Sequence, residues 1–308
     1  MPRRVPLEKL VNLQDNPENI RNVSILAHVD HGKTTLADSL ISSNGIISSR
    51  SITDQIRYMD SREDEQLRGI TMKTSSITLY HQKQSQNEDD QEFLINLIDS
   101  PGHIDFSSEV STAVRLSDGC LVVVDVVEGV CPQTQAVLKQ AWLEQQKPIL
   151  VLNKIDRLII EKKMTPLETY QRINQILEQV NAAVALLFSS DVMKENEQKY
   201  INNQNKLTPD KLTKHVKEQN LQFSIDADFV EIDDEGLYFT PESGNVVFAS
   251  AIHGWGFTVE HFAEMYAKKK GWSKDVLCKV LYGDFYMNTK LKKFCSGAIN
   301  RGKGSLRV

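Results

Sequence analysis

Short apolar runs recur along the chain, and each one ends in small, charged or turn-forming residues. The first three cover residues 22–27, 93–98 and 119–127. Two more of the same kind cover residues 148–152 and 246–249. A short continuous apolar run bounded by turn signals is typical of a strand that is buried on both faces. The hydrophobic pattern therefore predicts buried strands at these five places.

Segments with helical character separate these runs. They cover residues 35–42, 134–145 and 259–270. Strands that alternate with helices form βαβ units, and the strands of such units lie parallel in one sheet. We therefore predict an α/β fold with a mostly parallel central sheet and helices on both faces.

The connection between Asp156 and Ser250 is longer than a helix, a strand and short loops require. Residues 194–220 are rich in Lys, Glu, Gln and Asn, so this segment is expected to be mobile or marginally helical. Residues 221–245 carry seven acidic residues and no Lys or Arg. A long polar and acidic insertion is therefore expected here. The predicted organisation is an N-terminal extension (1–18), the first part of the main domain (19–190), the insertion (191–242), the last strand and helix of the main domain (243–270) and a basic tail (271–308).

Composition narrows the class of protein. Of the 308 residues, 40% are hydrophobic and 25% are charged, which is typical of a soluble globular chain. The N-terminus has no apolar stretch, and the longest apolar run, residues 121–127, is far shorter than the ~20 residues that cross a bilayer. Cysteine spacing shows no CxxC pair, so neither a disulfide framework nor structural zinc is expected. These features fit a reducing cytoplasm and no membrane. The cysteines are Cys120, Cys131, Cys278 and Cys295.

The charge of the chain is unevenly spread around a net value of −5. From residue 268 onward, Lys and Arg greatly outnumber Asp275 and Asp284. Two interpretations stay open for this basic segment. It binds a polyanion such as RNA, or it is simply a solvated basic face.

Residues 27–34 (AHVDHGKT) have the spacing of a phosphate-binding loop, with alanine in the position that is usually glycine. Backbone N–H groups at the start of a helix carry partial positive charge and attract phosphates. Lys33 is expected to bind the β- and γ-phosphates, and the Thr34 hydroxyl to bind Mg²⁺. Inside this loop, His28 and His31 are not expected to ligate a metal. The expected nucleotide contacts are Asp30, His31, Gly32, Lys33, Thr34 and Thr35.

The sequence DSPGH begins where the second predicted strand ends. This position places Asp99 beside the phosphate-binding loop, where it can reach Mg²⁺. Gly102 can offer a backbone N–H to the γ-phosphate, and His103 follows where an attacking water is oriented. A histidine that titrates near neutrality can hold or polarise such a water. Thr71, in the sequence RGIT, is a second candidate ligand of Mg²⁺.

The sequence NKID ends the fourth predicted strand and carries the choice of base. The Asp156 carboxylate can accept two hydrogen bonds from the N1–H and N2 amine of guanine, whereas adenine offers no such pair. Asn153 is expected to brace the loops, and the stem of Lys154 to lie over the base. The sequence SAI follows the next strand. Its expected contacts are Ser250, Ala251 and Ile252, with the Ala251 N–H directed at guanine O6.

Taken together, AHVDHGKTTL, RGIT, DSPGH, NKID and SAI resemble the guanine-nucleotide motifs of translational GTPases, over about residues 19–270. AHVDHGKTTLADSL and DSPGHIDFSSEV are similar to elongation factor 2 and its relatives. The similarity is closer to the eukaryotic elongation-factor-like GTPases of large-subunit maturation, which also carry a long insertion. This resemblance implies the fold of a P-loop NTPase. It rests on LISSNGIISSR, RYMDSREDEQLRGITMK, EGVCPQTQAVLKQAWLE and NVVFASAIHGWGF.

The resemblance implies a cytoplasmic, monomeric enzyme that binds GTP with Mg²⁺ and hydrolyses it to GDP and phosphate on the ribosome. It implies action with the Shwachman-Bodian-Diamond protein on the precursor of the large ribosomal subunit, its rRNA and proteins, to release the anti-association initiation factor. Such proteins continue with a β-barrel domain and further ribosome-binding domains. Residues 271–308 are therefore expected to be a truncated lead into a missing second domain.

The resemblance also implies roles for single residues. His103 turns towards the attacking water once the ribosome is bound. Val29 and Ile70 match a hydrophobic gate, and Asp30 matches an aspartate that holds a monovalent cation near the phosphates. The implied metal ligands are Thr34, Thr71 and, through a water, Asp99, and the implied catalytic residues are Lys33, Thr71, Gly102 and His103.

Two other interpretations stay open. One keeps the enzyme class and assigns the protein to translocation during elongation. The other, from a different class, is a truncated nucleotide-binding module without productive hydrolysis.

Overall fold

The chain forms two compact units, Met1–Val180 with Phe239–Val308, and Asn181–Tyr238. Every described strand belongs to the first unit. The computed structural model describes residues 5–47, 57–83, 91–205, 236–288, 293–296 and 305–307.

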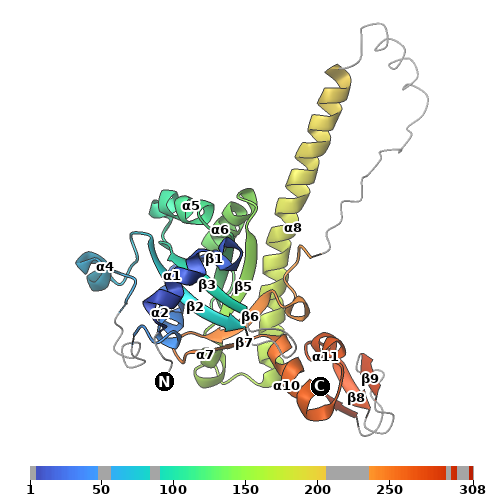
Figure 1. The fold of residues 1–308 in the computed structure, drawn as a ribbon. Coiled ribbons are helices and arrows are strands. Elements are labelled where there is room, and N and C mark those ends of the chain that lie inside the picture. Colours follow the sequence, from blue (N-terminus) through green and yellow to red (C-terminus); the bar gives the residue numbers. More distant parts are fainter. Residues whose placement is uncertain are drawn as a thin grey trace, which may run out of the picture. The chain divides into compact units, whose positions relative to one another are not determined.

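A seven-stranded sheet organises the first unit (Figure 1). In spatial order its strands are β2 (Ser75–Lys83), β3 (Gln91–Asp99), β1 (Ile20–Ala27), β4 (Gly119–Asp125), β5 (Lys147–Asn153), β6 (Val246–Ser250) and β7 (Trp255–Phe257). The five strands from β3 to β6 pair in parallel. The edge strands β2 and β7 run antiparallel to their neighbours.

The parallel strands are those that the apolar runs predict, so the predicted α/β fold with a mostly parallel sheet is confirmed. The two antiparallel edge strands were not predicted. Strand β2 (SSITLYHQK) is partly buried over residues 77–80, with only Leu79 in the core, and exposed over residues 81–83. An antiparallel strand with one solvated face needs no continuous apolar run, which is why this signal missed it.

Helices cover both faces of the sheet, and three of them match the predicted helical segments. Helix α6 begins at Pro132, since proline fits the first helical turn, where its missing N–H has no partner to lose. The helices are α1 (Leu7–Gln14), α2 (Lys33–Ser43), α4 (Glu63–Arg68), α5 (Ser107–Arg115), α6 (Pro132–Leu143), α7 (Ile155–Ile160), α8 (Pro166–Asn205), α10 (Val259–Lys270) and α11 (Lys274–Val280), with 3-10 turns η1 (Pro17–Asn19), η2 (Ile104–Phe106) and η3 (Pro241–Ser243).

The hydrophobic core lies on both sides of the sheet. On one side, Ile25 and Val123 belong to a buried cluster with Ala37 of α2. The alternate residues Leu26 and Val122 are also buried, at 1% and 0% exposure. Because successive side chains of a strand point to opposite faces, both faces of the sheet are covered. Helix α6 contacts β1 and β4, and α2 contacts β1 and β3.

Helix α8 starts in the first unit and continues into the second, which overlaps the predicted insertion 191–242. Residues 206–235 of that insertion lie outside the described residues. By length and composition alone, Pro166–Lys194 is a helix that could cross a membrane. Of its most apolar 18-residue window, 22% is buried, and Ile176 and Val180 in this helix are fully buried. The expectation of no membrane remains a prediction.

The basic tail, residues 271–308, contains α11 and a small antiparallel sheet. Its strands are β8 (Phe285–Asn288), β9 (Lys293–Ser296) and β10 (Ser305–Arg307), with β8 in the middle. Ala263 of α10 and Leu277 of α11 form a buried cluster against which Trp272 and Phe294 pack. The tail therefore shares a hydrophobic cluster with α10. Its role as a lead into a further domain stays a prediction.

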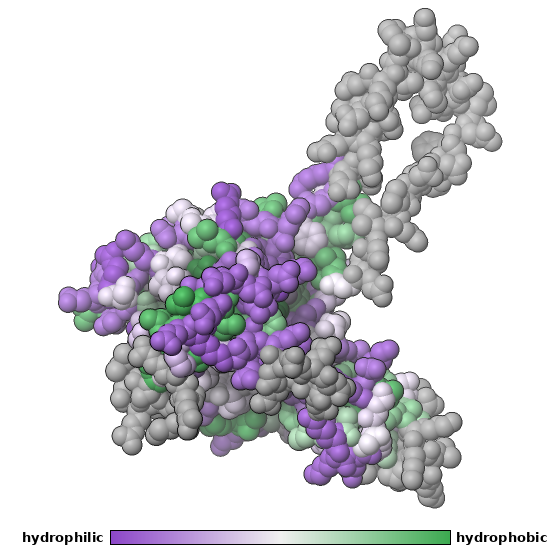
Figure 2. Space-filling view, in the orientation of Figure 1, coloured by the Kyte–Doolittle hydropathy of each residue, from purple (hydrophilic) through white to green (hydrophobic). Residues whose placement is uncertain are grey.

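Hydrophilic side chains cover much of the described surface on the face drawn in Figure 2, with smaller hydrophobic groups between them. Lys268, Lys269 and Lys270 in the last turn of α10 are exposed. Lys274 instead pairs with Glu260 and Glu264, at 2.6 and 2.7 Å. Part of the basic segment is thus available to a partner, and part is neutralised within the chain.

Strand β5 offers a direct test of which side chains face the core. Leu150 is fully buried, whereas its neighbour Ile149 is 39% exposed. Leu150→Ala is expected to lower the free energy of unfolding by about 2–5 kcal/mol, because it removes buried methyl groups and leaves a cavity. Ile149→Ala is expected to cost less than half as much. Urea unfolding followed by circular dichroism measures both, and equal losses would contradict the assigned faces of β5.

Candidate functional site

The predicted site residues follow the carboxyl ends of four parallel strands. β1 ends at Ala27, β3 at Asp99, β5 at Asn153 and β6 at Ser250. Parallel pairing brings these ends to one edge of the sheet. Ligands of open α/β sheets bind at this edge.

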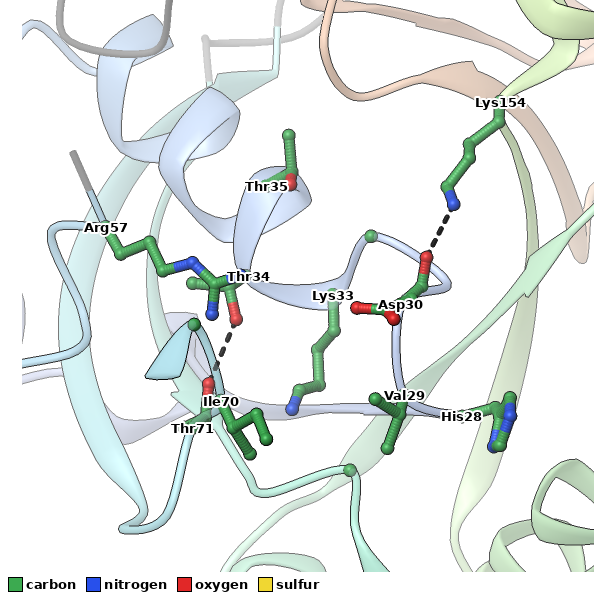
Figure 3. A pocket seen from close by; sticks show the side chains of 13 residues that line it. His28, Val29, Asp30, Lys33, Thr34, Thr35, Arg57, Ile70, Thr71 and Lys154 are labelled. Atoms are coloured by element: carbon green, nitrogen blue, oxygen red, sulfur yellow. Dashed lines mark hydrogen bonds between the residues drawn. The ribbon is translucent and has the colours of Figure 1, made fainter. Parts of the chain in front are cut away.

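Two adjoining pockets open at this edge, and they share Gly32, Thr35 and Lys154. The first pocket is drawn in Figure 3. It is lined by His28, Val29, Asp30, Gly32, Lys33, Thr34, Thr35, Arg57, Gly69, Ile70, Thr71, Gly102 and Lys154. The second pocket is lined by Gly32, Thr35, Asn153, Lys154, Asp156, Arg157, Glu161, Ala251, Ile252 and His253.

The loop before α2 has a backbone conformation at Gly32 that favours glycine. Gly32 has φ +92°, and a Cβ atom there would lie 2.4 Å from Asn153 Nδ2. Asp30 also has a left-handed backbone, with φ 61°. The chain then enters α2 at Lys33, so the backbone amides at this helix start border the first pocket. A helix start of this kind attracts anions.

Asp99 is a fully buried carboxylate next to Lys33. Lys33 Nζ lies 3.8 Å from Asp99 Oδ1. Neither oxygen of Asp99 has a hydrogen-bond partner of good geometry among the described residues, although the Thr34 hydroxyl and the Ser100 N–H are near enough to lower its pKa. Burial raises the pKa of Asp99, and the positive charge of Lys33 opposes this rise. A buried carboxylate with free lone pairs is costly unless a cation or a donor joins it.

Two threonine hydroxyls in the lining of the first pocket are within hydrogen-bond distance of each other. Thr34 Oγ1 and Thr71 Oγ1 are 3.1 Å apart (Figure 3). The Thr71 hydroxyl donates to Asp60 Oδ1 at 2.9 Å. These hydroxyls and Asp99 together provide hard oxygen donors, which suit Mg²⁺.

Two residues beside this pocket were missed by sequence analysis. Asp60 is buried and pairs with Arg57 at 3.2 Å, and Arg57 lines the first pocket. Through Thr71, Asp60 fixes one of the facing hydroxyls. Both residues belong to a segment rich in charges, where no local feature separates a buried aspartate from a solvated one.

The structure brings most of the remaining predicted residues of the first pocket together, but not His103. Val29, Ile70 and Gly102 line the pocket. A Cβ atom on Gly102 would lie 3.3 Å from the Ala27 carbonyl oxygen, so the backbones approach closely there. The His103 ring is outside the lining, with Nδ1 3.3 Å from Asp105 Oδ2.

The side chain of His31 is also outside both pockets. It is fully buried, and its Nδ1 lies 3.3 Å from the Val123 carbonyl oxygen. Burial lowers the pKa of His31, so the ring is neutral at pH 7. The contact with the nucleotide that the sequence predicts for His31 would therefore come from its backbone and not from its ring.

Asn153 links two of the loops. Its Nδ2 donates to the His31 carbonyl oxygen at 2.9 Å, and its Oδ1 accepts the Ala251 N–H at 3.0 Å. The predicted bracing contact therefore has a defined geometry. Because the Ala251 N–H already has this partner, its donation to a guanine O6 stays a prediction.

Lys154 extends along the shared wall of the two pockets. Its backbone is left-handed, with φ 63°. Its Nζ donates to the Asp30 carbonyl oxygen at 2.5 Å (Figure 3) and lies 2.8 Å from Asp125 Oδ2. Arg157 is the second cation near Asp125, at 3.6 Å. The buried carboxylate of Asp125, which the sequence did not single out, thus holds the lysine in place.

Asp156 presents a carboxylate to the second pocket. Its Oδ1 is buried without a hydrogen-bond partner among the described residues, and its Oδ2 lies 3.6 Å from His253 Nδ1. Ser250 turns towards the same ring, with Oγ 2.9 Å from His253 Nδ1. Ala251 and Ile252 line the pocket, whereas Ser250 does not. The pocket therefore offers an acceptor that needs N–H donors.

Comparison with known proteins gives consistent relatives. The family model for the elongation factor Tu GTP binding domain matches residues 18–282. Over 302 residues the chain is 56% identical to "Elongation factor-like GTPase 1" of Mus musculus and of Homo sapiens. It is 50% identical to "Ribosome assembly protein 1" of Schizosaccharomyces pombe and 49% identical to that of Saccharomyces cerevisiae. These alignments cover 94–98% of this chain but only 26% of each relative.

A third buried carboxylate next to the first pocket makes stability depend on pH. Burial raises the pKa of Asp38 from 3.8 to about 7. The folded chain therefore holds a proton that the unfolded chain loses between these values, so stability falls as pH rises from 4 to 7. Asp38→Asn keeps the acceptor for the Tyr58 N–H. Without nucleotide and Mg²⁺, it is expected to gain on the order of 1 kcal/mol over wild type across this range.

Chemical unfolding at pH 5 and pH 8 measures this gain. The exposed Asp15→Asn serves as the control, and its difference from wild type is expected to be the same at the two pH values. A constant difference between Asp38→Asn and wild type at both pH values would contradict the assigned cause.

Proposed function

Because its match spans residues 18–282, the chain belongs to the family of elongation factor Tu GTP-binding domains, and we propose that it binds and hydrolyses GTP during assembly of the large ribosomal subunit. One observation carries the proposal. Lys33 lines the first pocket and lies 3.8 Å from the buried Asp99 carboxylate, and Asp156, whose Oδ1 has no hydrogen-bond partner among the described residues, lines the adjoining second pocket. The Asp99 carboxylate suits a cation, and the Asp156 carboxylate suits the N–H groups of a base.

In this proposal the first pocket holds the phosphates. The amides at the start of α2 and the Lys33 ammonium bind the β- and γ-phosphates. Because Gly102 has no side chain, its backbone N–H can approach the γ-phosphate closely. Gly32 and Thr35 line both pockets, so a nucleotide that spans them contacts both residues. Asp30, at the mouth of the loop, is the proposed contact for a monovalent cation.

The oxygen donors of this pocket fit Mg²⁺. Thr34 and Thr71 supply hydroxyls, and Asp99 supplies a carboxylate that holds a metal-bound water. When bound, Mg²⁺ neutralises charge on the phosphate oxygens. Asp60 keeps the Thr71 hydroxyl turned into the pocket through its hydrogen bond.

The second pocket holds guanine. The Asp156 carboxylate accepts from N1–H and the N2 amine, and the Lys154 stem covers the base. Adenine has no matching donors and leaves Asp156 unpaired, which is the basis of discrimination. Asn153 holds the phosphate-binding loop and the Ala251 segment at a fixed separation.

Hydrolysis follows from positioning and electrostatic stabilisation rather than from a covalent intermediate. His103 orients the attacking water after it leaves its contact with Asp105 and passes between Val29 and Ile70. Since the ring lies outside the first pocket here, the resting chain is expected to turn over slowly. Isolated Ras-like domains without an activator turn over at about 10⁻⁴–10⁻³ per second.

The ribosomal role rests on the relatives. The names "Elongation factor-like GTPase 1" and "Ribosome assembly protein 1" belong to proteins that are 49–56% identical to this chain. The chain spans about a quarter of their length, so the activity of a whole protein comes to it only as part of this proposal. We assign it to the cytoplasm, as a monomer. Its proposed partners are the large ribosomal subunit, the Shwachman-Bodian-Diamond protein and, indirectly, the anti-association initiation factor.

The preference for guanine over other bases tests the proposed role of the second pocket. Asp156→Asn replaces one acceptor oxygen by a donor, so GDP affinity is expected to fall by about tenfold to a hundredfold. Affinity for xanthosine diphosphate should rise, because xanthine carries a carbonyl oxygen where guanine carries the amine. Glu161→Gln, which changes another carboxylate of the same pocket, is the control. Fluorescent-nucleotide titration measures all three proteins, and unchanged preference in Asp156→Asn would reject guanine at this pocket.

Ribosome-stimulated hydrolysis tests the role of His103. Large subunits are expected to accelerate GTP turnover, and His103→Ala to reduce the stimulated rate by about 10² or more. GDP binding should be unchanged, since the ring is outside the pocket. The exposed His81→Ala is the matched control. Phosphate release with and without subunits measures the rates.

The same assay separates the alternatives. Binding of GTP without any stimulated turnover would support a nucleotide-binding module instead of an enzyme. Stimulation by complete ribosomes alone, and not by large subunits, would favour elongation over subunit assembly.

A further inference from the structure

Four side chains with metal-binding atoms gather beside the phosphate-binding loop. His28 and His31 belong to the loop between β1 and α2, and Glu128 and Cys131 to the segment between β4 and α6. One ligand atom from each of the four lies within 4.8 Å of the others. None of the four serves as a ligand in the proposed Mg²⁺ site.

Against the expectation from the sequence, in which neither the cysteine spacing nor the two histidines indicates a metal, we propose that His28, His31, Glu128 and Cys131 form a binding site for a zinc-class divalent cation. Tetrahedral zinc, with bonds of about 2.0–2.3 Å, places N and O ligands about 3.3 Å apart and N and S ligands about 3.6 Å apart. His31 Nε2 lies 3.3 Å from Glu128 Oε2 and 3.8 Å from Cys131 Sγ. The distances from His31 Nε2 to two of the other ligand atoms are therefore already close to those of a tetrahedral site.

His28 is the fourth proposed ligand. The rings of His28 and His31 meet edge to face, with centroids 5.0 Å apart. Gln133 Oε1 contacts Nδ1 of His28 and fixes the orientation of this ring. A held histidine loses little freedom when a metal binds, which favours binding.

The buried His31 ring can serve the metal without moving. Its Nδ1 lies 3.3 Å from both the Val123 carbonyl oxygen and the Asp125 N–H. Without metal, the ring accepts from Asp125 and donates through Nε2 to Glu128. With metal on Nε2, the tautomer reverses: Nδ1–H donates to the Val123 carbonyl oxygen, and the Asp125 N–H gives up its hydrogen bond to Nδ1. A backbone carbonyl in this position is the usual second partner of a zinc-bound histidine.

The donor set selects the class of metal. Two imidazoles, one thiol and one carboxylate suit zinc or a similar transition metal, whereas Mg²⁺ prefers oxygen donors alone. Cys131 is also the N-cap residue of α6. The cation would join the phosphate-binding loop to the start of α6. This inference stands apart from the proposed hydrolysis of GTP, and its test needs no turnover.

Cobalt(II) is a suitable probe because it reports thiolate ligation by its absorption. The full chain, reduced and free of affinity tags, is titrated with cobalt(II) in excess Mg²⁺. One equivalent is expected to produce a thiolate-to-cobalt charge-transfer band, and zinc to abolish it by displacement. Cys131→Ser is expected to remove the band and to weaken zinc binding at least about tenfold. Serine is itself a good N-cap, so this variant keeps α6 capped.

Two further variants complete the test. Glu128→Gln, which changes an exposed side chain, is expected to weaken zinc binding while the fold is kept. Cys278→Ser removes a thiol elsewhere and should leave the band unchanged. The absence of a band in the folded wild type, or a band that survives Cys131→Ser, would overturn the proposal.

Discussion

The geometry of the site depends on the Asn153 amide. It spans two loops that lie far apart in the chain, by donating to the His31 carbonyl oxygen and accepting from the Ala251 N–H. Gly32 has no side chain to block it, since a Cβ atom there would meet Nδ2 at 2.4 Å. The separation of the two pockets is therefore set by one buried side chain and by the glycine that admits it.

Around this brace, the sheet gathers carboxylates that the protein alone does not satisfy. Among the described residues, Asp125 has two cations beside it, Lys154 at 2.8 Å and Arg157 at 3.6 Å, whereas Asp99 has Lys33 at 3.8 Å and Asp156 has His253 at 3.6 Å. A buried charge that is weakly paired is unfavourable. The contrast separates a carboxylate that holds the structure from two that a ligand would stabilise.

Much of this arrangement could be predicted from local sequence signals. Continuous apolar runs identify the parallel strands, and parallel strands bring their carboxyl ends together, so Lys33, Asp99 and Asp156 could be placed at one edge. Contacts that depend on the path of the chain could not be predicted. Asp60 reaches Thr71 only after a polar segment folds back. The direction of the His31 side chain follows a left-handed residue at Asp30, which no periodicity signals.

The buried Asp99 carboxylate also has a thermodynamic consequence. Its burial cost falls on the folded state alone, because the unfolded chain leaves this group in water. Whatever cation and nucleotide join it therefore act as folding ligands by mass action. At a hundredfold excess over the dissociation constant, such a ligand adds about 2.7 kcal/mol to the free energy of unfolding. The cellular supply of nucleotide would then set how long the chain persists as well as how fast it works.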